Sequence, residues 1–294
     1  MTRRIFYVMS GQAHLPYLVC SLHTLRKYWD GQVRIYAWPE SYDLAKVIAT
    51  DRRLGIERVE LSEPPYRRSR AIGSNSQFLH KIQMARSMKG QVDSALYLDA
   101  DTTVHGDLGQ LFIRAELRGF CATQWNQWTT NSGIVAKRLK GLYEVEMIDR
   151  SALDLLLEDP WPSVNGGVWA SRPDSPVLPT WFDWTLAACP MFIADERVLH
   201  VLQVAYGPKD QFLTATDKGK WNSCPKLNAT LPLDEMVVRH YHGDSCCRPT
   251  KSRQGYDSWW PIYQECLQEN VGMMSDWRGL VKNKHLDRID PFVQ

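Results

Sequence analysis

The sequence predicts an α/β protein in which a mainly parallel sheet is flanked by helices within a single continuous domain. Within the first hundred residues, apolar runs of strand length alternate with stretches of helix length. Such alternation is typical of parallel strands joined by helical crossovers. The chain has 294 residues, which is long enough to bury a large core, and no internal repeat or low-complexity linker divides it.

The alternation places the expected elements along the chain. Strands are expected over residues 3–9, 33–38, 56–61 and 95–98, and helices over residues 16–28, 42–51 and 75–88. The later part adds a helix over 140–157, a strand over 163–171, a helix beginning at 195, a strand over 237–243 and a closing helix from 256. We therefore expect helices on both faces of the sheet.

Composition excludes several classes of protein. Thirty-five Lys and Arg residues against thirty-three Asp and Glu give a net charge of +2, which argues against wholesale binding to nucleic acid or to an anionic membrane. No apolar run has the length of a secretory signal or a bilayer span, so we expect a cytoplasmic protein with no membrane span. Seven cysteines without regular spacing, including the adjacent Cys246 and Cys247, favour free thiols in a reducing compartment. The oligomeric state is left open.

Two aspartates follow the strand expected over 95–98, in the stretch "ALYLDADTTVH". Asp99 and Asp101 are separated by one small residue, so in extended chain their side chains leave the same face. In parallel α/β sheets, ligands bind at the carboxyl ends of the strands, which is where these acids lie. Two converging carboxylates can hold one divalent cation. A solvated turn after the strand is the alternative.

Three later segments accompany "YLDAD" in a fixed order. They are "VNGGVWAS" at 164–171, "ADERVLHVL" at 194–202 and "VVRHYHG" at 237–243, with "RP" following at 248–249. Together the four segments resemble the glycogenin-like and lipopolysaccharide galactosyltransferase group of retaining glycosyltransferases, which have the GT-A fold. In that group an Asp-x-Asp strand end precedes Asn-Ser-Gly-Val, Asp-Gln, His-Phe-x-Gly and Lys-Pro segments.

The resemblance covers roughly residues 1–250 and implies a Rossmann-like GT-A domain over residues 1–294. Residues 1–105 would form the nucleotide-sugar-binding half and residues 106–255 the acceptor-facing half. Residues 256–294 would add a closing helix and a C-terminal tail.

The resemblance also implies a metal centre. Asp99 and Asp101 would bind a divalent cation that bridges the donor diphosphate, and His240 would be the third protein ligand. Oxygen ligands with one imidazole suit Mn²⁺, and Mg²⁺ can substitute. His242 is expected on the same strand face as His240, so it is an alternative ligand. Either histidine is alternatively a plain surface residue of a strand.

Donor-binding residues follow from the same resemblance. Lys81 would lie near the donor phosphates, or it is an ordinary solvated lysine. Arg248 would replace the family's lysine near the leaving diphosphate. After the first strand the family usually carries an acid and a tyrosine, whereas this chain has "SGQAHLPY". Ser10, Gly11 and His14 would border the nucleotide there, and a UDP-sugar is expected by analogy.

Residues near the transferred sugar come from two of the segments. Asn165 and Gly166 would lie beside the sugar, where glycine permits close approach, or they form a hairpin turn. Asp195 and Glu196 stand where the family has Asp-Gln, so a carboxylate replaces an amide beside the reaction centre. Asp195 is alternatively the N-cap of the helix that follows.

These features predict a metal-dependent glycosyltransferase that retains the anomeric configuration. Its partners would be a nucleotide-sugar donor and a saccharide or glycolipid acceptor, with Trp125–Trp128 and Arg67–Arg70 as candidate acceptor surfaces. A nucleic-acid acceptor is an alternative suggested by Tyr66 and the arginines beside it. Two other functions remain: a haloacid-dehalogenase-type phosphatase with Asp99 as nucleophile and Asp101 as acid/base, or a non-catalytic sugar-binding module.

Overall fold

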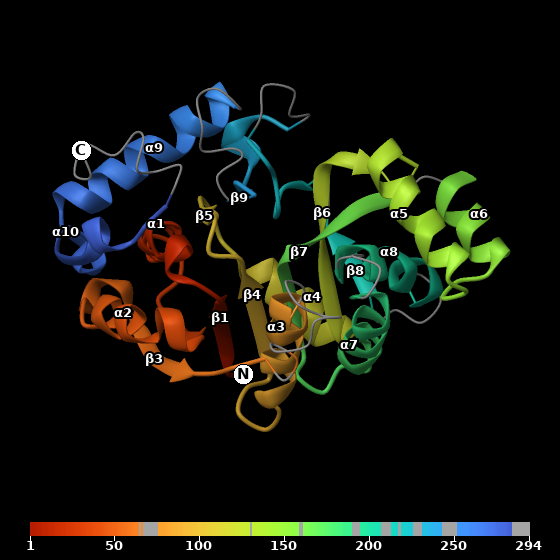
Figure 1. The fold of residues 1–294 in the computed structure, drawn as a ribbon, viewed down its shortest axis with the longest axis horizontal. Helices are drawn as coiled ribbons and strands as arrows, with labels where there is room; N and C mark the ends of the chain where they lie inside the picture. Colours follow the sequence, from red (N-terminus) through yellow and green to blue (C-terminus); the bar gives the residue numbers. More distant parts are fainter. Residues whose placement is uncertain are drawn as a thin grey trace. The chain divides into compact units, whose positions relative to one another are not determined.

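The computed structural model describes residues 1–64, 66, 76–129, 131–158, 161–189, 195–206, 213–216, 219–225, 231–242 and 252–283 (Figure 1). The chain divides into two compact units, each assembled from three segments. Unit 1 consists of residues 1–3, 64–97 and 109–222. Unit 2 consists of residues 4–63, 98–108 and 223–294.

Unit 2 contains three parallel strands in the order β3-β2-β1. Their bounds are β1 (Arg3–Met9), β2 (Gln32–Ala37) and β3 (Ile56–Leu61). The crossover helices between them are α1 (Leu15–Leu25) and α2 (Pro39–Ala49), followed by a 3-10 turn η2 (Arg52–Leu54). Apart from Val8, the residues of β1 from Arg4 onward are buried, as expected for a strand covered on both faces.

A second, smaller sheet in unit 2 joins two distant parts of the sequence. The strands β5 (Thr102–Val104) and β9 (Val238–His240) pair antiparallel, with Thr102 opposite His240. Helix α1 supports β5 through side chains, because Thr24 Oγ1 accepts from the Val104 N–H at 3.0 Å and Ser21 Oγ lies 3.1 Å from Thr102 Oγ1. The β5–β9 pair is therefore fixed to the body of its own unit.

The C-terminal part of unit 2 is helical. It comprises α9 (Arg253–Gln268), η8 (Val271–Met273), α10 (Met274–Trp277) and η9 (Arg278–Leu280), after an isolated turn η6 (Leu233–Glu235). The closing helix expected from residue 256 begins three residues earlier, where Ser252 caps α9 by accepting from the Gly255 N–H at 3.0 Å.

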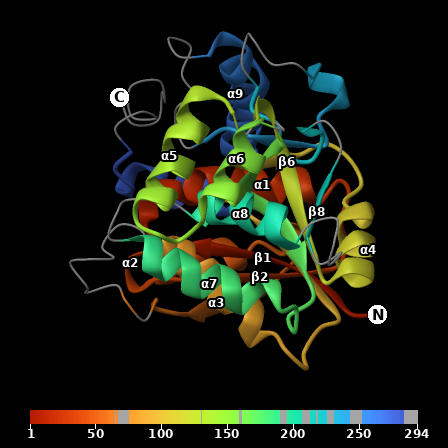
Figure 2. The ribbon, with the colours of Figure 1, turned by 90° about the vertical axis from the view of Figure 1, so that its right-hand side faces the viewer.

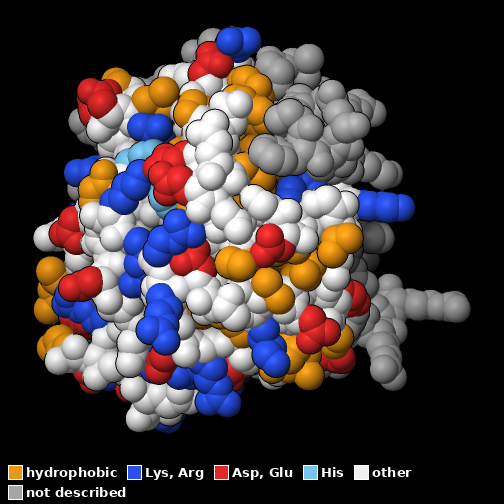
Figure 3. Space-filling view, turned by 90° about the vertical axis from the view of Figure 1, so that its left-hand side faces the viewer, with side chains coloured by type: hydrophobic (Ala, Val, Ile, Leu, Met, Phe, Trp, Pro, Cys, Tyr) orange, Lys and Arg blue, Asp and Glu red, His pale blue; other side chains and the backbone are white. Residues whose placement is uncertain are grey.

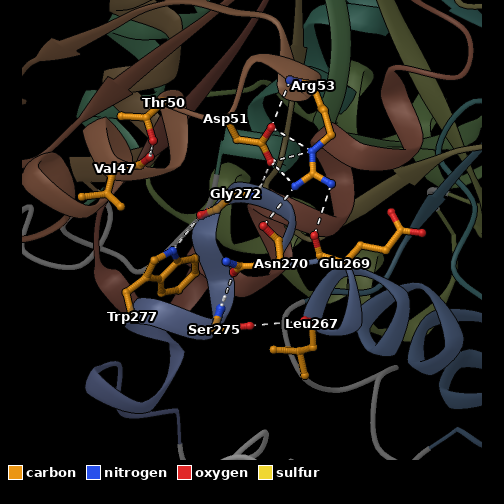
Figure 4. Close-up of polar contacts among 10 residues, drawn as sticks. All are labelled: Val47, Thr50, Asp51, Arg53, Leu267, Glu269, Asn270, Gly272, Ser275 and Trp277. Carbon is orange, nitrogen blue, oxygen red and sulfur yellow. Dashed lines mark hydrogen bonds and ion pairs between the residues drawn. The ribbon is translucent and has the colours of Figure 1, made fainter.

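One aspartate ties this helical part to η2 (Figure 4). The Asp51 carboxylate accepts from the N–H groups of Arg53 at 3.0 Å and Gly272 at 2.7 Å, and it pairs with the Arg53 guanidinium. Arg53 in turn donates to the carbonyls of Glu269 and Asn270. Burial would raise the pKa of Asp51, but the hydrogen bonds from Arg53 and from Gly272 outweigh it and lower that pKa below its ordinary value.

Unit 1 contains four strands in the order β4-β7-β6-β8. Their bounds are β4 (Ser94–Leu98), β7 (Pro162–Ser171), β6 (Phe120–Thr129) and β8 (Leu213–Thr216). Strand β6 pairs antiparallel with β7 and parallel with β8. Parallel pairs in both units, with helical crossovers between strands, confirm the predicted mixed α/β fold with a mainly parallel sheet.

The helices of unit 1 are α3 (Ser76–Ser87), α4 (Gly109–Arg118), α5 (Gly133–Glu144), α6 (Arg150–Glu158), α7 (Val177–Ala188) and α8 (Asp195–Tyr206). Figure 2 shows α3 and α7 lying side by side, in agreement with their packing. The single helix predicted over 140–157 is wrong. Two helices occupy that stretch, and the chain between them passes through Glu146 at a φ of 59°.

Aromatic side chains form the centre of unit 1. Trp169 and Trp181 are fully buried with ring centroids 5.1 Å apart, and Phe120 stacks on Trp169 at 5.5 Å. Tyr97 lies 5.5 Å from the same tryptophan. Each large ring contributes a large apolar area, so these tryptophans stabilise the core rather than offer a surface for sugars.

The structure also bears on the expectations about cysteines, membrane-spanning helices and surface charge. The cysteines that the structure describes, at positions 20, 121, 189, 224 and 266, are free and buried, as predicted. Cys246 and Cys247 lie outside the described residues, as do Arg67, Arg68 and Arg70. No described helix has the length and apolarity needed to cross a membrane. On the face in Figure 3, basic and acidic side chains are interspersed rather than gathered by sign.

Because the pKa of Asp51 is lowered in the folded state, its carboxylate stabilises the fold above the ordinary carboxyl pKa of about 4, and this stabilisation disappears as pH falls below that value. We expect Asp51→Asn to lower the free energy of unfolding by about 1–2 kcal/mol at pH 7. Urea unfolding at pH 7 and at pH 3 measures the difference, which should shrink in acid. The exposed Asp30→Asn is the control, and an equal loss at both pH values would contradict the assignment.

Candidate functional site

Asp99, Asp101 and His240 come together in unit 2. One ligand atom from each lies within 4.8 Å of the others. His240 Nε2 is 3.5 Å from Asp99 Oδ2 and 3.3 Å from Asp101 Oδ1. The His240 side chain is 4% exposed, whereas those of Asp99 and Asp101 are 30% and 13% exposed. A ligand therefore approaches this cluster from the side of the carboxylates.

Backbone hydrogen bonds hold the three groups in place. Thr102 donates to the Asp99 carbonyl from its N–H at 3.2 Å and from its hydroxyl at 2.8 Å, which makes a tight turn after β4. The Tyr241 N–H donates to the Asp101 carbonyl at 2.9 Å, one residue beyond the Thr102–His240 pair of the small sheet. The pairing of β5 with β9 thus positions the imidazole beside the aspartates.

The chemistry of this donor set fits a divalent cation. Carboxylate oxygens with one imidazole nitrogen are ligands that suit Mn²⁺ and also Mg²⁺. Two carboxylates this close to one another and to an imidazole are costly unless a positive charge lies between them. Asp99 and Asp101 are not a freely solvated turn, because the turn is hydrogen-bonded and faces a buried histidine.

His242 takes a different position from the one predicted. The strand expected over 237–243 ends at His240, and His242 has a φ of 52°, outside the strand region. The prediction that both histidines lie on one strand face is therefore wrong. The His242 ring instead stacks on the ring of His240 at 4.0 Å, and the acid–imidazole group that the described residues form contains His240.

The residues expected at the nucleotide lie where β1 ends. Ser10 follows β1 directly, Gly11 is extended at the start of η1 (Gln12–His14), and His14 is the last residue of η1. A Cβ at Gly11 would meet nothing within 4 Å, so the space beside this residue is open. Contact with a nucleotide stays a prediction for all three residues. Arg248 lies outside the described residues.

A second cluster, in unit 1, is built around a buried ion pair. Lys81 Nζ lies 2.7 Å from Asp195 Oδ2, with side chains 4% and 1% exposed. The ammonium also donates to the Gly166 carbonyl at 2.7 Å. It further lies over the rings of Phe78, Tyr97 and Trp181, at 5.2 to 5.9 Å from their centroids. The alternative of a solvated lysine is therefore wrong.

A bulge in β7 brings the Gly166 carbonyl to Lys81. Along the β6–β7 pair, Ala122 lies opposite Trp169 but the next residue, Thr123, lies opposite Asn165, so residues 166–168 are extra. A Cβ at Gly166 would lie 2.8 Å from Lys81 Nζ and nearer still to Asp195 Oδ2. Glycine is needed here because the ion pair occupies the space of a side chain. The hairpin alternative for residues 165 and 166 is wrong, since both lie inside a strand.

Asn165 connects the bulge to the start of α8. Its amide nitrogen donates to Glu196 Oε1 in a very short contact, while its oxygen accepts from the Gly167 N–H at 2.8 Å and from Asn222 Nδ2 at 3.0 Å. These partners leave the amide one orientation. Asn165 and Glu196 are therefore held together, as Asp195 and Lys81 are.

Sequence reasoning gave no role to three residues of this cluster. Asn222, which also donates to Thr123 Oγ1 at 2.9 Å, stands in no periodic segment. Arg197 is 7% exposed, and its Nη2 lies 3.6 Å from Glu196 Oε2. His200 is fully buried, accepts from the Val164 N–H at 2.9 Å, and stays neutral because burial lowers its pKa to about 3.

The fit of Gly166 against the ion pair is testable by adding one methyl group. We expect Gly166→Ala to lower the free energy of unfolding by about 1–3 kcal/mol, because the new Cβ must displace Lys81 or Asp195. Gly133→Ala is the matched control, since a Cβ there meets nothing within 4 Å at the start of α5. Urea unfolding of both variants measures the effect, and equal stabilities would contradict the packing described.

No protein-family model matches the chain, and no curated relative matches it in sequence. Several solved structures match the chain in fold. Mouse xyloside xylosyltransferase 1 is 12% identical over 82% of this chain and 98% of its own, with a TM-score of 0.56. Galactosyltransferase LgtC with donor and acceptor sugar analogs is 12% identical over 89% of this chain and 95% of its own, also at 0.56. An active-site glutamine-to-glutamate mutant of LgtC covers the same shares at 13% identity and a TM-score of 0.59.

Identities this low show the fold rather than the activity. The chain shares its architecture with glycosyltransferases over most of its length, and over nearly all of theirs. The protein therefore has the GT-A fold that the four sequence segments predicted.

Proposed function

We propose that the protein is a metal-dependent glycosyltransferase that moves a sugar from a nucleotide-sugar donor to an acceptor with retention of configuration. The observation that carries this proposal is the Asp99–Asp101–His240 cluster in a chain with the GT-A fold. By analogy the donor is a UDP-sugar, and the reaction takes place in the cytoplasm.

Asp99, Asp101 and His240 would hold the cation, with Mn²⁺ or Mg²⁺ matching the ligand set. When bound, the metal supplies positive charge that stabilises the diphosphate as the bond between sugar and phosphate breaks. His240 is buried beside both aspartates, and a histidine binds a metal through its neutral imidazole.

The unit 1 cluster is proposed to act on the sugar. Asn165 and Gly166 would border the transferred sugar, where the absent side chain permits close approach. Lys81 holds the Asp195 carboxylate in one orientation, and Asn165 and Arg197 hold Glu196. A fixed carboxylate beside the anomeric carbon would stabilise the positive charge that develops there in the transition state.

The remaining donor contacts are proposed from the resemblance. Ser10, Gly11 and His14 would border the nucleotide at the end of β1, and Arg248 would lie near the leaving diphosphate. Residues 1–105 would then serve the donor and residues 106–255 the acceptor, within one continuous domain over 1–294. Lys81 is proposed to act near the phosphates through Asp195 and Gly166, which its ammonium contacts.

The acceptor is proposed to be a saccharide or a glycolipid. A nucleic-acid acceptor would need a basic surface, and the described face in Figure 3 has none that is free of acids.

Metal dependence is the first test. In Mn²⁺, a hundredfold excess of UDP over its Kd should add about 2.7 kcal/mol to the stability of the fold, measured by thermal shift. Asp101→Asn or His240→Ala should abolish this gain, because each removes a ligand of the cluster. The exposed Asp43→Asn is the charge-matched control and should behave as wild type.

Three results would contradict this assignment. Full activity of the wild type in excess chelator would remove the role of the metal. Hydrolysis of a simple aryl phosphate would instead support a phosphatase that uses Asp99 as the nucleophile. A donor that binds but stays intact on long incubation would support a sugar-binding module.

Glu196→Gln tests the mechanism. Glutamine keeps an oxygen that can accept from Asn165 but loses the negative charge opposite Arg197, so we expect transfer to be slower yet measurable. Asp195→Ala should lower the rate of transfer far more. It leaves the Lys81 ammonium buried without its carboxylate partner, which should also lower the free energy of unfolding by about 3–5 kcal/mol. Glu144→Gln, exposed on α5, is the matched control.

The anomeric configuration of the product, read by NMR, decides between mechanisms. Retention is expected for the wild type and for Glu196→Gln. An inverted product, together with a dead Glu196→Gln variant, would make Glu196 the general base and overturn the retaining assignment.

A further inference from the structure

A cavity of about 720 Å³ lies within unit 2. It is lined by Leu233, Arg239, Arg253, Gln254, Asp257 and Ser258. Its volume falls in the range of sites that take a small molecule. Two guanidinium groups and one carboxylate are among the described residues that line it, so these residues carry excess positive charge.

Arg239 lies on β9 next to His240 but is not part of the Asp99–Asp101–His240 cluster. It precedes His240 on β9, and since neighbouring residues of a strand point to opposite faces, its side chain leaves the strand on the side away from the cluster. Its Nη2 donates to the Leu233 carbonyl at 3.0 Å, while its Nε is buried without an acceptor. Among the described residues no carboxylate forms an ion pair with Arg239.

Arg253 adds a second charge at the first turn of α9. It pairs with Asp257 at 2.9 Å, but the two side chains are 66% and 51% exposed, so the pair is weak and can give way to a competing anion. Gln254 and Ser258 lie on the same side of this 16-residue helix, whose N-terminus itself favours negative charge.

A chain of hydroxyl groups links Ser258, which lines the cavity, to the small sheet. Thr103 Oγ1 lies 3.2 Å from the Tyr241 hydroxyl, which lies 3.1 Å from Ser258 Oγ. Ser258 in turn donates to the Gly255 carbonyl at 2.9 Å. The small sheet and α9, which both contribute lining residues, are therefore held together by hydrogen bonds beside the cavity.

The positive charge of Arg239 lowers the pKa of a neighbouring histidine, His105. His105 faces β9 from the end of β5, where its N–H donates to the Val237 carbonyl at 2.7 Å. Burial first, and then the charges of Arg239 and Lys27, lower the pKa of His105 to about 3. The imidazole is therefore neutral and adds no positive charge beside Arg239.

We propose that this cavity binds an anionic saccharide, with Arg239 and Arg253 gripping its phosphate or carboxylate group. Arg239 and Arg253 both line the cavity, and planar guanidinium groups suit both kinds of oxyanion. That the saccharide is the acceptor of transfer rests on the proposed function. The site would then select acceptors that carry a negative charge.

The test measures binding in chelator, where the metal cluster cannot hold a phosphate. Glucose 6-phosphate and glucuronate should raise the melting temperature, and uncharged glucose should not. Arg239→Gln and Arg253→Gln should each weaken binding of whichever anion stabilises the wild type by at least about tenfold. Arg58→Gln, on the exposed edge strand β3, is the charge-matched control and should bind as wild type.

The outcomes separate this proposal from the transferase assignment. No stabilisation by either anionic sugar, or equal binding by wild type and both arginine variants, overturns the anion site. Because Arg239 and Arg253 are not metal ligands, both variants should keep Mn²⁺-dependent UDP binding. If wild type fails to bind UDP while sugar binding still depends on Arg239, the anion site stands and the proposed function falls.

Discussion

The arrangement of Asp99, Asp101 and His240 in unit 2 depends on the three-residue pairing of β5 with β9. This pairing sets Thr102 opposite His240 and so carries an imidazole to two aspartates from a distant part of the sequence. The same pairing aims Arg239 to the other side of the strand. So short a ladder has few hydrogen bonds of its own, and further support comes from Thr24 of α1, the Tyr241 hydroxyl and the backbone of Ser223.

In unit 1 the corresponding constraint is electrostatic. Taking Lys81 and Asp195 out of water costs several kcal/mol per ion, and their attraction offsets this only with good geometry and further hydrogen bonds. The Gly166 carbonyl and three aromatic rings provide those contacts. Apolar residues of equal size would stabilise the core at least as well. An ion pair kept beside Asn165 and Glu196 is therefore better explained by orientation of a carboxylate than by stability.

Much of this fold follows from the sequence, because buried strands and amphipathic helices have periods that residues reveal directly. The stretch over 140–157 misled that reasoning, since its apolar spacing continues across Glu146, where the backbone turns. At the sites, Asp99, Asp101 and His240 were predictable from ordered motifs. The role of Asn222 was not, because its contacts with Thr123 and Asn165 join segments far apart in the chain. The bulge in β7 was not predictable either, because the sequence indicates it only by the two glycines at 166 and 167.

Each compact unit draws on three separate segments, and this interleaving governs how the protein can be made. No contiguous fragment consists of one unit alone, so truncation cannot isolate either unit for separate study. On the ribosome, the eleven residues from Leu98 to Leu108 emerge long before the C-terminal segment that completes their unit. Until β9 is synthesised, Asp99 and Asp101 lack their histidine, so the cluster of Asp99, Asp101 and His240 can form only late in synthesis.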